Sequence, residues 1–319
     1  MCTAIACQTG DFYFGRNLDY EFSYGEKVVL TPRRYPFVFR KAGSMTEPYA
    51  FLGMAHIADG YPLYYDGVNE KGLCIAGLNF VGNAFYPSPT EAKAHTLLAP
   101  FEFIPYLLGK CASVAEAREL LSDMALVHIP FSDTFPPSPL HYMLADATEC
   151  ITIEPVKEGL MVYDDPVGVL TNNPPFPMQL LNLSNYTALS RKQPVPSFAE
   201  GFSPTLYSRG MGAIGLPGDV SSMSRFVRAA FAKMNSVCEP GEKESVNQFF
   251  HLLGCVEQVR GMCEVAPGQY EITIYSSCMN ATRGIYYYTT YEDRQIKNAS
   301  LMEAPTVLAG EGLVIKAEL

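Results

Sequence analysis

The order of strand-forming and helix-forming segments constrains the fold of this chain more than any other sequence feature. Strand patterns fall at residues 1–16, 61–80, 140–155, 159–171 and 270–291, and the helical patterns are grouped between them. Such grouping is typical of α+β proteins, in which helices pack on antiparallel sheets, and it disfavours alternating βαβ units. We therefore expect an α+β fold with two stacked antiparallel sheets.

Two of these strand segments have the pattern of a hairpin. Within residues 1–16, the turn sequence Thr9-Gly10-Asp11 separates two alternating stretches. Within residues 61–80, the sequence NEKG separates YPLYYDGV from LCIAGLNF. Alternation with a period of two, bounded by turn residues, predicts paired strands.

Helical patterns occupy the intervening segments. Ser113 and Glu116 have the spacing of a capping box, which predicts that a helix begins there. The expected helices span residues 97–110, 113–121, 177–189, 222–235 and 245–254.

No internal repeat or low-complexity linker divides the 319 residues. Residues 191–218 are rich in Pro, Ser and Gly and lack periodicity, and ordered loops of that length are usually functional or interfacial. We expect a single domain over 1–319, with a long loop excursion near 187–212.

Composition excludes several partners and compartments. The formal net charge is −10 and there is no dense Lys/Arg run, which argues against a nucleic-acid partner and an anionic membrane surface. No apolar stretch approaches eighteen residues, and MCTAIACQTGDFYFGRN lacks the pattern of a secretory signal. The nine cysteines show no C-x-x-C pair, so we expect reduced thiols in a cytoplasmic protein, without zinc, another metal or a cofactor.

Cys2 is the first candidate for chemistry because it directly follows Met1. If Met1 is removed, one residue carries both a thiol and the α-amine of the chain. An α-amine has an unperturbed pKa of about 7.7–8.0, so it is suited to accept the thiol proton near neutral pH. The sequence therefore permits an N-terminal nucleophile that supplies its own base.

The motif FGRNLD places two charged residues on the strand that pairs with the N-terminal strand. The turn at Gly10 brings Arg16 back beside Cys2, where a guanidinium stabilises a thiolate. Asp19 is a candidate to hold the α-amine. Residues three apart on a regular strand face opposite sides, so we expect the strand to end or bulge near Asn17 if both are to reach Cys2.

A series of motifs in a fixed order extends from residue 1 to about 295. These are MCTAIA, FGRNLD, YPLYYDGVNEKGLCIAGLNF, LTNNPPF, GLPGD, SMSRFVRAAF, SSCMN and GIYYYTTY. With these motifs the chain resembles the choloylglycine hydrolase family of N-terminal-nucleophile hydrolases, and within it the bile salt hydrolases. The resemblance implies a four-layer αββα sandwich and hydrolysis of a linear amide.

The resemblance also implies roles for particular residues. Asn172 in LTNNPPF and Asn79 in AGLNF match donors that hold the oxyanion, and Asn173, just before Pro174, is better suited to a turn. Arg225 in SMSRF matches a second active-site arginine. The complete catalytic set is Cys2, Arg16, Asp19, Asn79, Asn172 and Arg225.

Three functions stay open at this point. The first is hydrolysis of the amide that joins a bile acid to glycine or taurine. The second is a related acylase acting on penicillin V or acyl-homoserine lactones, in which tyrosine tends to replace Asn79. The third is a non-catalytic protein that binds an apolar ligand, which would not require Cys2, Arg16 and Asp19 together. Asn79 favours the bile salt.

A steroid requires a large apolar pocket with few polar anchors. The proline-rich stretch VHIPFSDTFPPSP at 127–139 offers apolar side chains on a stiffened loop, and Leu18 lies between the two charged residues. We expect the steroid to contact Leu18, Ile57 (on a neighbouring loop), Ile129, Phe131 and Phe135.

The resemblance finally implies a homotetramer in which residues 187–212 reach a neighbouring subunit. This stretch carries Phe198, Phe202, Leu206 and Tyr207 on an otherwise polar loop. Exposed aromatic side chains are costly unless a partner covers them, and symmetric self-association supplies one.

Overall fold

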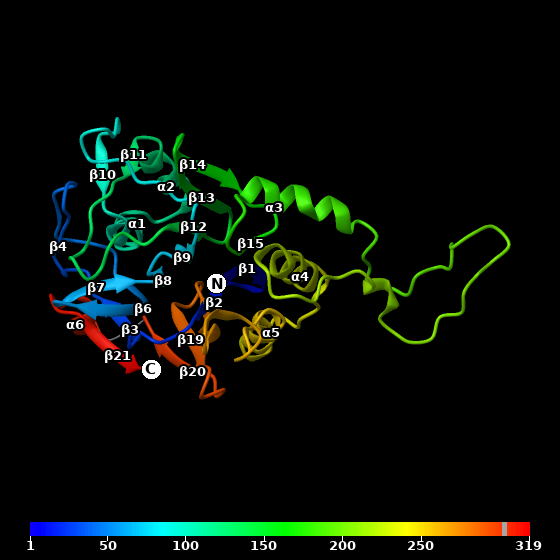
Figure 1. Cartoon of the computed structure of the whole chain (residues 1–319). Coiled ribbons are helices and arrows are strands. Elements are labelled where there is room, and N and C mark those ends of the chain that lie inside the picture. The colour runs from blue at the N-terminus through cyan, green and yellow to red at the C-terminus, as the bar shows by residue number, and fades with distance from the viewer. Residues whose placement is uncertain (302–304) are drawn as a thin grey trace.

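The computed structural model describes residues 1–301 and 305–319, and two antiparallel sheets form its centre (Figure 1). One sheet has six strands. In spatial order these are β15 (Val169–Leu170), β1 (Cys2–Thr9), β2 (Asp11–Tyr20), β18 (Ile272–Asn280), β19 (Ile285–Thr290) and β20 (Lys297–Ser300).

The second sheet has nine strands. In spatial order they are β14 (Gly159–Asp164), β13 (Cys150–Val156), β12 (Leu140–Ala145), β9 (Cys74–Asn79), β8 (Asp66–Asn69), β6 (Phe51–Ala58), β3 (Lys27–Thr31) and β21 (Val314–Glu318), with β7 (Tyr61–Tyr64) paired to β6. Short pairs complete the strands: β4 (Phe37–Val38) with β5 (Ser44–Met45), β10 (Thr96–Leu98) with β11 (Met124–Leu126), and β16 (Glu264–Ala266) with β17 (Gln269–Tyr270).

Helices cover the outer face of each sheet. The nine-stranded sheet packs against α1 (Phe103–Lys110) and α2 (Val114–Leu121), and the six-stranded sheet packs against α4 (Ser222–Asn235) and α5 (Glu242–Gly254) (Figure 1). The layers therefore run helix, sheet, sheet, helix, as expected for an N-terminal-nucleophile hydrolase. The other helical segments are α3 (Phe176–Asn182), α6 (Pro305–Leu308) and three short 3-10 turns at Pro100–Glu102, Leu183–Tyr186 and Met211–Ala213.

Two glycines allow the N-terminal hairpin to form and to pack. Gly10 joins β1 to β2 with a φ of +85°, a conformation that favours glycine. Gly15 lies where β2 passes close to β18, because an added Cβ would come within 1.9 Å of the Ser277 carbonyl oxygen. The hairpin predicted from residues 1–16 is therefore present, and it forms the middle of the six-stranded sheet.

Some predicted bounds need correction. The helix expected over 97–110 begins later, because Thr96–Leu98 is a strand that pairs in parallel with Met124–Leu126. In the predicted capping box, the Ser113 hydroxyl accepts from the Glu116 N–H at 3.2 Å, but the Glu116 carboxylate accepts from the Ala112 N–H instead. The helix expected over 245–254 begins three residues earlier, at Glu242.

The segment between α3 and α4 extends far from the two sheets (Figure 1). Phe198 is 78% exposed and Tyr207 is 82% exposed, although Phe198 packs edge-on against Phe202 with ring centroids 5.9 Å apart. This segment includes residues 187–212. We refer to residues 187–212 as the excursion.

Among the described residues, no helix is long and apolar enough to cross a membrane, and no group of three or more His, Cys, Asp or Glu side chains is placed to hold a metal ion. All nine cysteines lie in the described part of the chain and are free thiols. Cys2, Cys74, Cys111 and Cys278 are buried, whereas Cys255 is exposed.

Candidate active site

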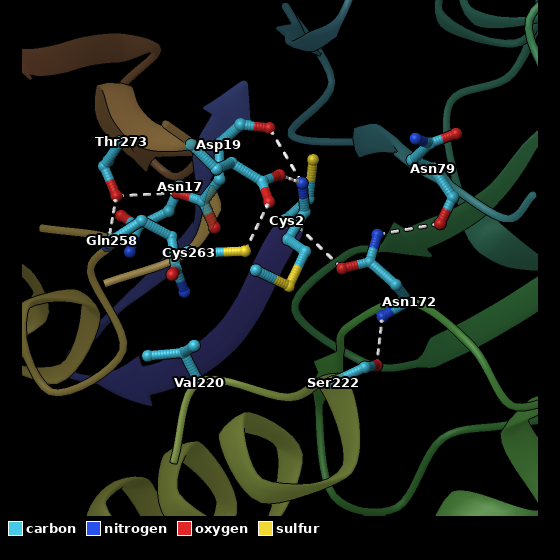
Figure 2. Close-up of polar contacts among 12 residues, drawn as sticks. Cys2, Asn17, Asp19, Asn79, Asn172, Val220, Ser222, Gln258, Cys263 and Thr273 are labelled. Carbon is cyan, nitrogen blue, oxygen red and sulfur yellow. Dashed lines mark hydrogen bonds and ion pairs between the residues drawn. The ribbon is translucent and has the colours of Figure 1, made fainter. Parts of the chain in front are cut away.

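Cys2 is the first residue of β1 and is almost fully buried near the middle of the six-stranded sheet. It pairs directly with Leu18 on β2. Its Sγ accepts a hydrogen bond from Arg16 Nη2 at 2.6 Å, and its backbone N–H donates to Asn172 Oδ1 at 2.8 Å. Figure 2 shows Cys2 between Asp19 on one side and Asn172 on the other.

Arg16 holds the thiol from the space between the two sheets. Its Nη1 donates to the carbonyl oxygens of Gly77 and Tyr65 in the second sheet, and the side chain is fully buried. Burial alone would lower the pKa of Arg16, but attraction to Cys2 and then to other negative groups, including Asp66, raises it above its ordinary value. The guanidinium is therefore a fixed positive charge next to the sulfur.

Asp19 lies on the opposite face of β2 from Arg16. Its Oδ1 accepts from Thr273 Oγ1 at 2.6 Å, whereas Oδ2 is buried and has no hydrogen-bond partner among the described residues. On the same face, Asn17 Nδ2 donates to the Leu253 carbonyl oxygen of α5, so this side of the strand faces the helices. Burial raises the pKa of Asp19.

Strand β2 neither ends nor bulges near Asn17, so that expectation is wrong. The pairing of β2 with β1 is regular from Asp11 to Leu18, and the bulge lies in the neighbouring strand β18, between Thr273 and Tyr275. Strand alternation is kept, so Arg16 reaches the thiol from one face and Asp19 approaches the N-terminal end of β1 from the other.

The N-terminal ammonium of Met1 lies on the Asp19 side of the site. It forms an ion pair with Glu271 and donates to the Asp19 carbonyl oxygen at 3.0 Å. Burial lowers the pKa of this ammonium group, and attraction to Cys2 and Asp19 opposes that effect. An amine at this end of β1 therefore meets acceptors on the helix side of the sheet.

Asn172 joins the site from the loop after β15. Its Oδ1 accepts from both the Cys2 N–H and Arg225 Nη2, the latter at 2.7 Å, and its Nδ2 donates to the Asn79 carbonyl oxygen at 2.7 Å. Arg225, on α4, also donates to the Cys2 carbonyl oxygen and to Thr3 Oγ1. Burial lowers the pKa of Arg225.

Asn79 ends β9 on the far side of Asn172 (Figure 2). Its backbone oxygen holds Asn172, whereas its half-buried side chain makes no hydrogen bond to another described residue. The Asn79 carboxamide is thus available to a ligand. The structure brings all six predicted catalytic residues, from β1, β2, β9, the β15–α3 loop and α4, to one place.

Comparison with known proteins identifies the family. The protein family described as "Linear amide C-N hydrolases, choloylglycine hydrolase family" matches this sequence over residues 2–314. The chain belongs to the choloylglycine hydrolase family. It is therefore a linear amide C–N hydrolase, and the sequence resemblance is confirmed.

Relatives of this choloylglycine hydrolase cover nearly its whole length. "Bile salt hydrolase/transferase" of Lactiplantibacillus plantarum is 56% identical over 94% of this chain and 92% of that protein. The Clostridium perfringens protein of the same name is 40% identical over 93% and 91%. A crystal structure of mutant conjugated bile acid hydrolase from Clostridium perfringens superposes with a TM-score of 0.91 at 36% identity, covering 99% of this chain and 97% of that one.

A more distant structure shares the fold alone. Penicillin V acylase from Agrobacterium tumefaciens superposes with a TM-score of 0.74 at 20% identity, covering 98% of this chain and 90% of that one.

The predicted steroid contacts lie on several elements of the choloylglycine hydrolase fold. Leu18 is half-buried opposite Cys2, and Ile129, Phe131 and Phe135 are half-buried in the proline-rich loop. Ile57 is half-buried too, but it lies in strand β6 and not on a loop as predicted.

A row of aromatic side chains leads from the catalytic strand toward this loop. The ring centroids of Tyr20 and Phe22 lie 5.1 Å apart, and those of Phe22 and Tyr24 lie 4.8 Å apart. Tyr24 lies 6.4 Å from His56, and His56 lies 5.6 Å from Phe135. We call Tyr20, Phe22, Tyr24, His56, Phe135 and Phe131 the aromatic row.

Sequence reasoning missed several residues of this site. The alternating aromatics Tyr20, Phe22 and Tyr24 directly follow Asp19, which is a signal that the sequence does contain. Nothing local marks Glu271, which contacts the N-terminal ammonium only because β18 pairs with β2.

Proposed function

We propose that this choloylglycine hydrolase cleaves the amide bond of glycine- or taurine-conjugated bile salts, with Cys2 as the nucleophile once Met1 is removed. The observation that carries the proposal is the Cys2 environment: Arg16 Nη2 lies 2.6 Å from the sulfur and Asn172 Oδ1 lies 2.8 Å from the nitrogen. The names of the bacterial relatives supply the substrate class.

Activation of Cys2 follows from its two polar groups. Cys2 is almost fully buried, and burial disfavours the charged form of an amine, so this position favours the neutral amine that accepts the thiol proton. Arg16 then stabilises the thiolate. Asn172 and Asp19 hold the amine from the two sides of β1.

In the acylation step, the thiolate attacks the amide carbonyl carbon and the C=O electron pair moves to oxygen. One Nδ2 hydrogen of Asn172 is bonded to the Asn79 carbonyl oxygen, and the other hydrogen can donate to this oxyanion, as can the Asn79 carboxamide. Each such donor contributes about 3–4 kcal/mol. When the C–N bond breaks, the departing amine takes the proton from the Cys2 ammonium, leaving a thioester.

In the deacylation step, water attacks the thioester carbonyl and gives a proton to the Cys2 amine. The C–S bond breaks, releasing the bile acid and restoring the thiolate. Arg225 holds the Cys2 carbonyl oxygen and Asn172 together through both steps, so it keeps the nucleophile aligned with the oxyanion donor.

The aromatic row provides the apolar surface for the steroid. Phe22 is 49% exposed and Tyr24 is 39% exposed, so both offer ring faces to a ligand although they lie close to the catalytic strand. Leu18, which pairs with Cys2, adds aliphatic surface at the catalytic end, whereas Ile57 packs with the apolar cluster that includes side chains of α1. When the rigid steroid rings bind to this surface, the acyl tail of the bile salt points toward Cys2.

Turnover of glycocholate, taurocholate and penicillin V by the purified protein tests the proposal, with intact mass spectrometry to verify that Met1 is absent. We expect hydrolysis of the two bile salts at a kcat/KM at least about tenfold above that for penicillin V. Cys2→Ala should abolish hydrolysis and keep the same circular dichroism spectrum. Preference for penicillin V, or a Cys2→Ala variant within tenfold of wild type, would contradict it.

We also propose that the protein acts in the cytoplasm, as a single domain that assembles into a homotetramer. Nine free thiols suit a reducing compartment, and the exposed aromatics of the excursion suit a contact between copies. Light scattering should give a mass of about four times the 35.2 kDa chain.

A further inference from the structure

Gln179 is a fully buried polar residue that the proposed chemistry does not use. It lies on α3, and its Nε2 donates to the Asn172 carbonyl oxygen at 2.8 Å and to Thr171 Oγ1 at 3.0 Å. Its Oε1 is buried and has no hydrogen-bond partner in the part of the chain that the structure describes. The Gln179 side-chain nitrogen therefore bonds to the loop that carries Asn172, while the Gln179 side-chain oxygen is removed from water without gaining a hydrogen bond.

Ser222 completes this contact from the beginning of α4. Its Oγ accepts from the Asn172 N–H at 2.8 Å and donates to Thr171 Oγ1 at 2.9 Å, while Thr171 Oγ1 donates to the Ser222 carbonyl oxygen at 3.1 Å. Gln179 Nε2 also lies 3.3 Å from Ser222 Oγ. The backbone N–H and C=O of Asn172 are thus both bonded to side chains from helices.

A buried unpaired acceptor lowers stability. An apolar residue of similar size in place of Gln179 would avoid that cost, but it would leave the buried Asn172 carbonyl oxygen without this donor at a similar cost. Stability alone therefore does not account for glutamine at this position. Its donors instead fix the backbone of Asn172, whose side chain contacts Cys2 and Arg225.

We propose that Gln179 is a positioning residue that, with Ser222, sets the orientation of the Asn172 carboxamide for oxyanion stabilisation. The inference rests on the proposed function for the role of Asn172. A donor acts on an oxyanion only within about 0.5 Å of its productive position, so loosening this loop lowers the rate without weakening steroid binding.

Gln179→Met is the test variant because methionine is close in length and shape but donates no hydrogen bond. We expect kcat on glycocholate to fall by about ten- to a hundredfold, with KM within about twofold of wild type. In an Asn172→Ala background the same substitution should change kcat by less than about twofold, since the group it positions is gone.

Gln248→Met is the matched control. Gln248 is a half-buried glutamine on α5 whose Nε2 donates to Ser236 Oγ at 2.8 Å, away from Cys2. Its kcat should stay within about twofold of wild type. Equal losses for Gln179→Met in the wild-type and Asn172→Ala backgrounds would overturn the inference, because they would indicate a general structural defect.

A crystal structure of processed Gln179→Met separates this inference from the proposed function. We expect Asn172 Oδ1 to leave its hydrogen bond with the Cys2 nitrogen. An Asn172 side chain that keeps this bond would refute the positioning role, whichever substrate the enzyme uses. If Asn172 moves but wild type fails to hydrolyse bile salts, the proposed function fails and the positioning role stands.

Discussion

Replacing Asn172 by alanine should separate a catalytic loss from a structural one. The change removes the Nδ2 donor proposed to hold the oxyanion, and loss of one such donor costs about 2.7–4 kcal/mol in the transition state. We therefore expect kcat on glycocholate to fall by about 10²–10³. KM should change little, because the proposed role places Asn172 at the reacting carbonyl and not at the steroid.

The same substitution has a second effect that the structure also predicts. Asn172 Oδ1 accepts from Arg225 Nη2 and from the Cys2 nitrogen, so alanine leaves two buried donors without this acceptor. Each unsatisfied donor costs about 1–3 kcal/mol. The free energy of unfolding in urea should fall accordingly, measured alongside single-turnover kinetics on glycocholate.

The neighbouring Asn173 offers a matched control within the same loop. Its Nδ2 donates to the Val81 carbonyl oxygen at a more exposed position, and among the described residues its side chain makes no hydrogen bond to a proposed catalytic residue. Asn173→Ala should keep kcat within about twofold of wild type. The reasoning is refuted if Asn172→Ala retains kcat within tenfold, or if Asn173→Ala loses as much.

Three further outcomes are expected. Asn79→Tyr should lower kcat/KM on glycocholate by at least about tenfold and raise the relative rate on penicillin V, and an unchanged ratio of the two rates would show that Asn79 does not set preference. Deleting residues 194–208 should reduce the mass measured by light scattering to that of a dimer or monomer, whereas an unaltered mass would exclude the excursion as the main contact. Burial raises the pKa of Asp165 to about 6. The native state then binds more protons than the unfolded state between about pH 4 and 6, so unfolding free energy should fall by up to about 3 kcal/mol as pH rises through this window. Asp165→Asn should remove that decrease. If the variant and wild type show the same pH dependence of the unfolding free energy in urea, Asp165 is not the source of the decrease.

Local sequence predicted the parts of the fold that local interactions determine. The hairpin around Gly10 is present as predicted, although its second strand continues beyond residue 16 to Tyr20, and the helix Ser222–Asn235 has the predicted bounds. Turn chemistry specifies the hairpin, and an apolar stripe specifies the helix. Leu97 and Leu98, at the start of the helix predicted over 97–110, lie in the strand Thr96–Leu98 instead, because this strand pairs with β11, which is far away in the chain. Long-range pairing of a three-residue strand leaves no periodic signal.

The candidate site shows the same division. The register of β1 and β2 places Arg16 near Cys2, and this could be worked out from one turn. The contact of Asn172 with Cys2 joins residues 170 positions apart, and only the family resemblance pointed to it. Gln179 and Glu271 carried no signal at all, since their roles depend on packing between elements.

The two faces of the strand that carries Arg16 and Asp19 have a consequence for how this enzyme can vary. In the proposed mechanism the thiol responds to groups between the sheets, such as Arg16, and the amine responds to groups on the helix side, such as Asp19 and Thr273. Substitutions in one layer therefore act mainly on the thiol, and substitutions in the other layer act mainly on the amine. A single strand in this way lets natural variation or directed evolution change two catalytic properties separately, although one residue provides both.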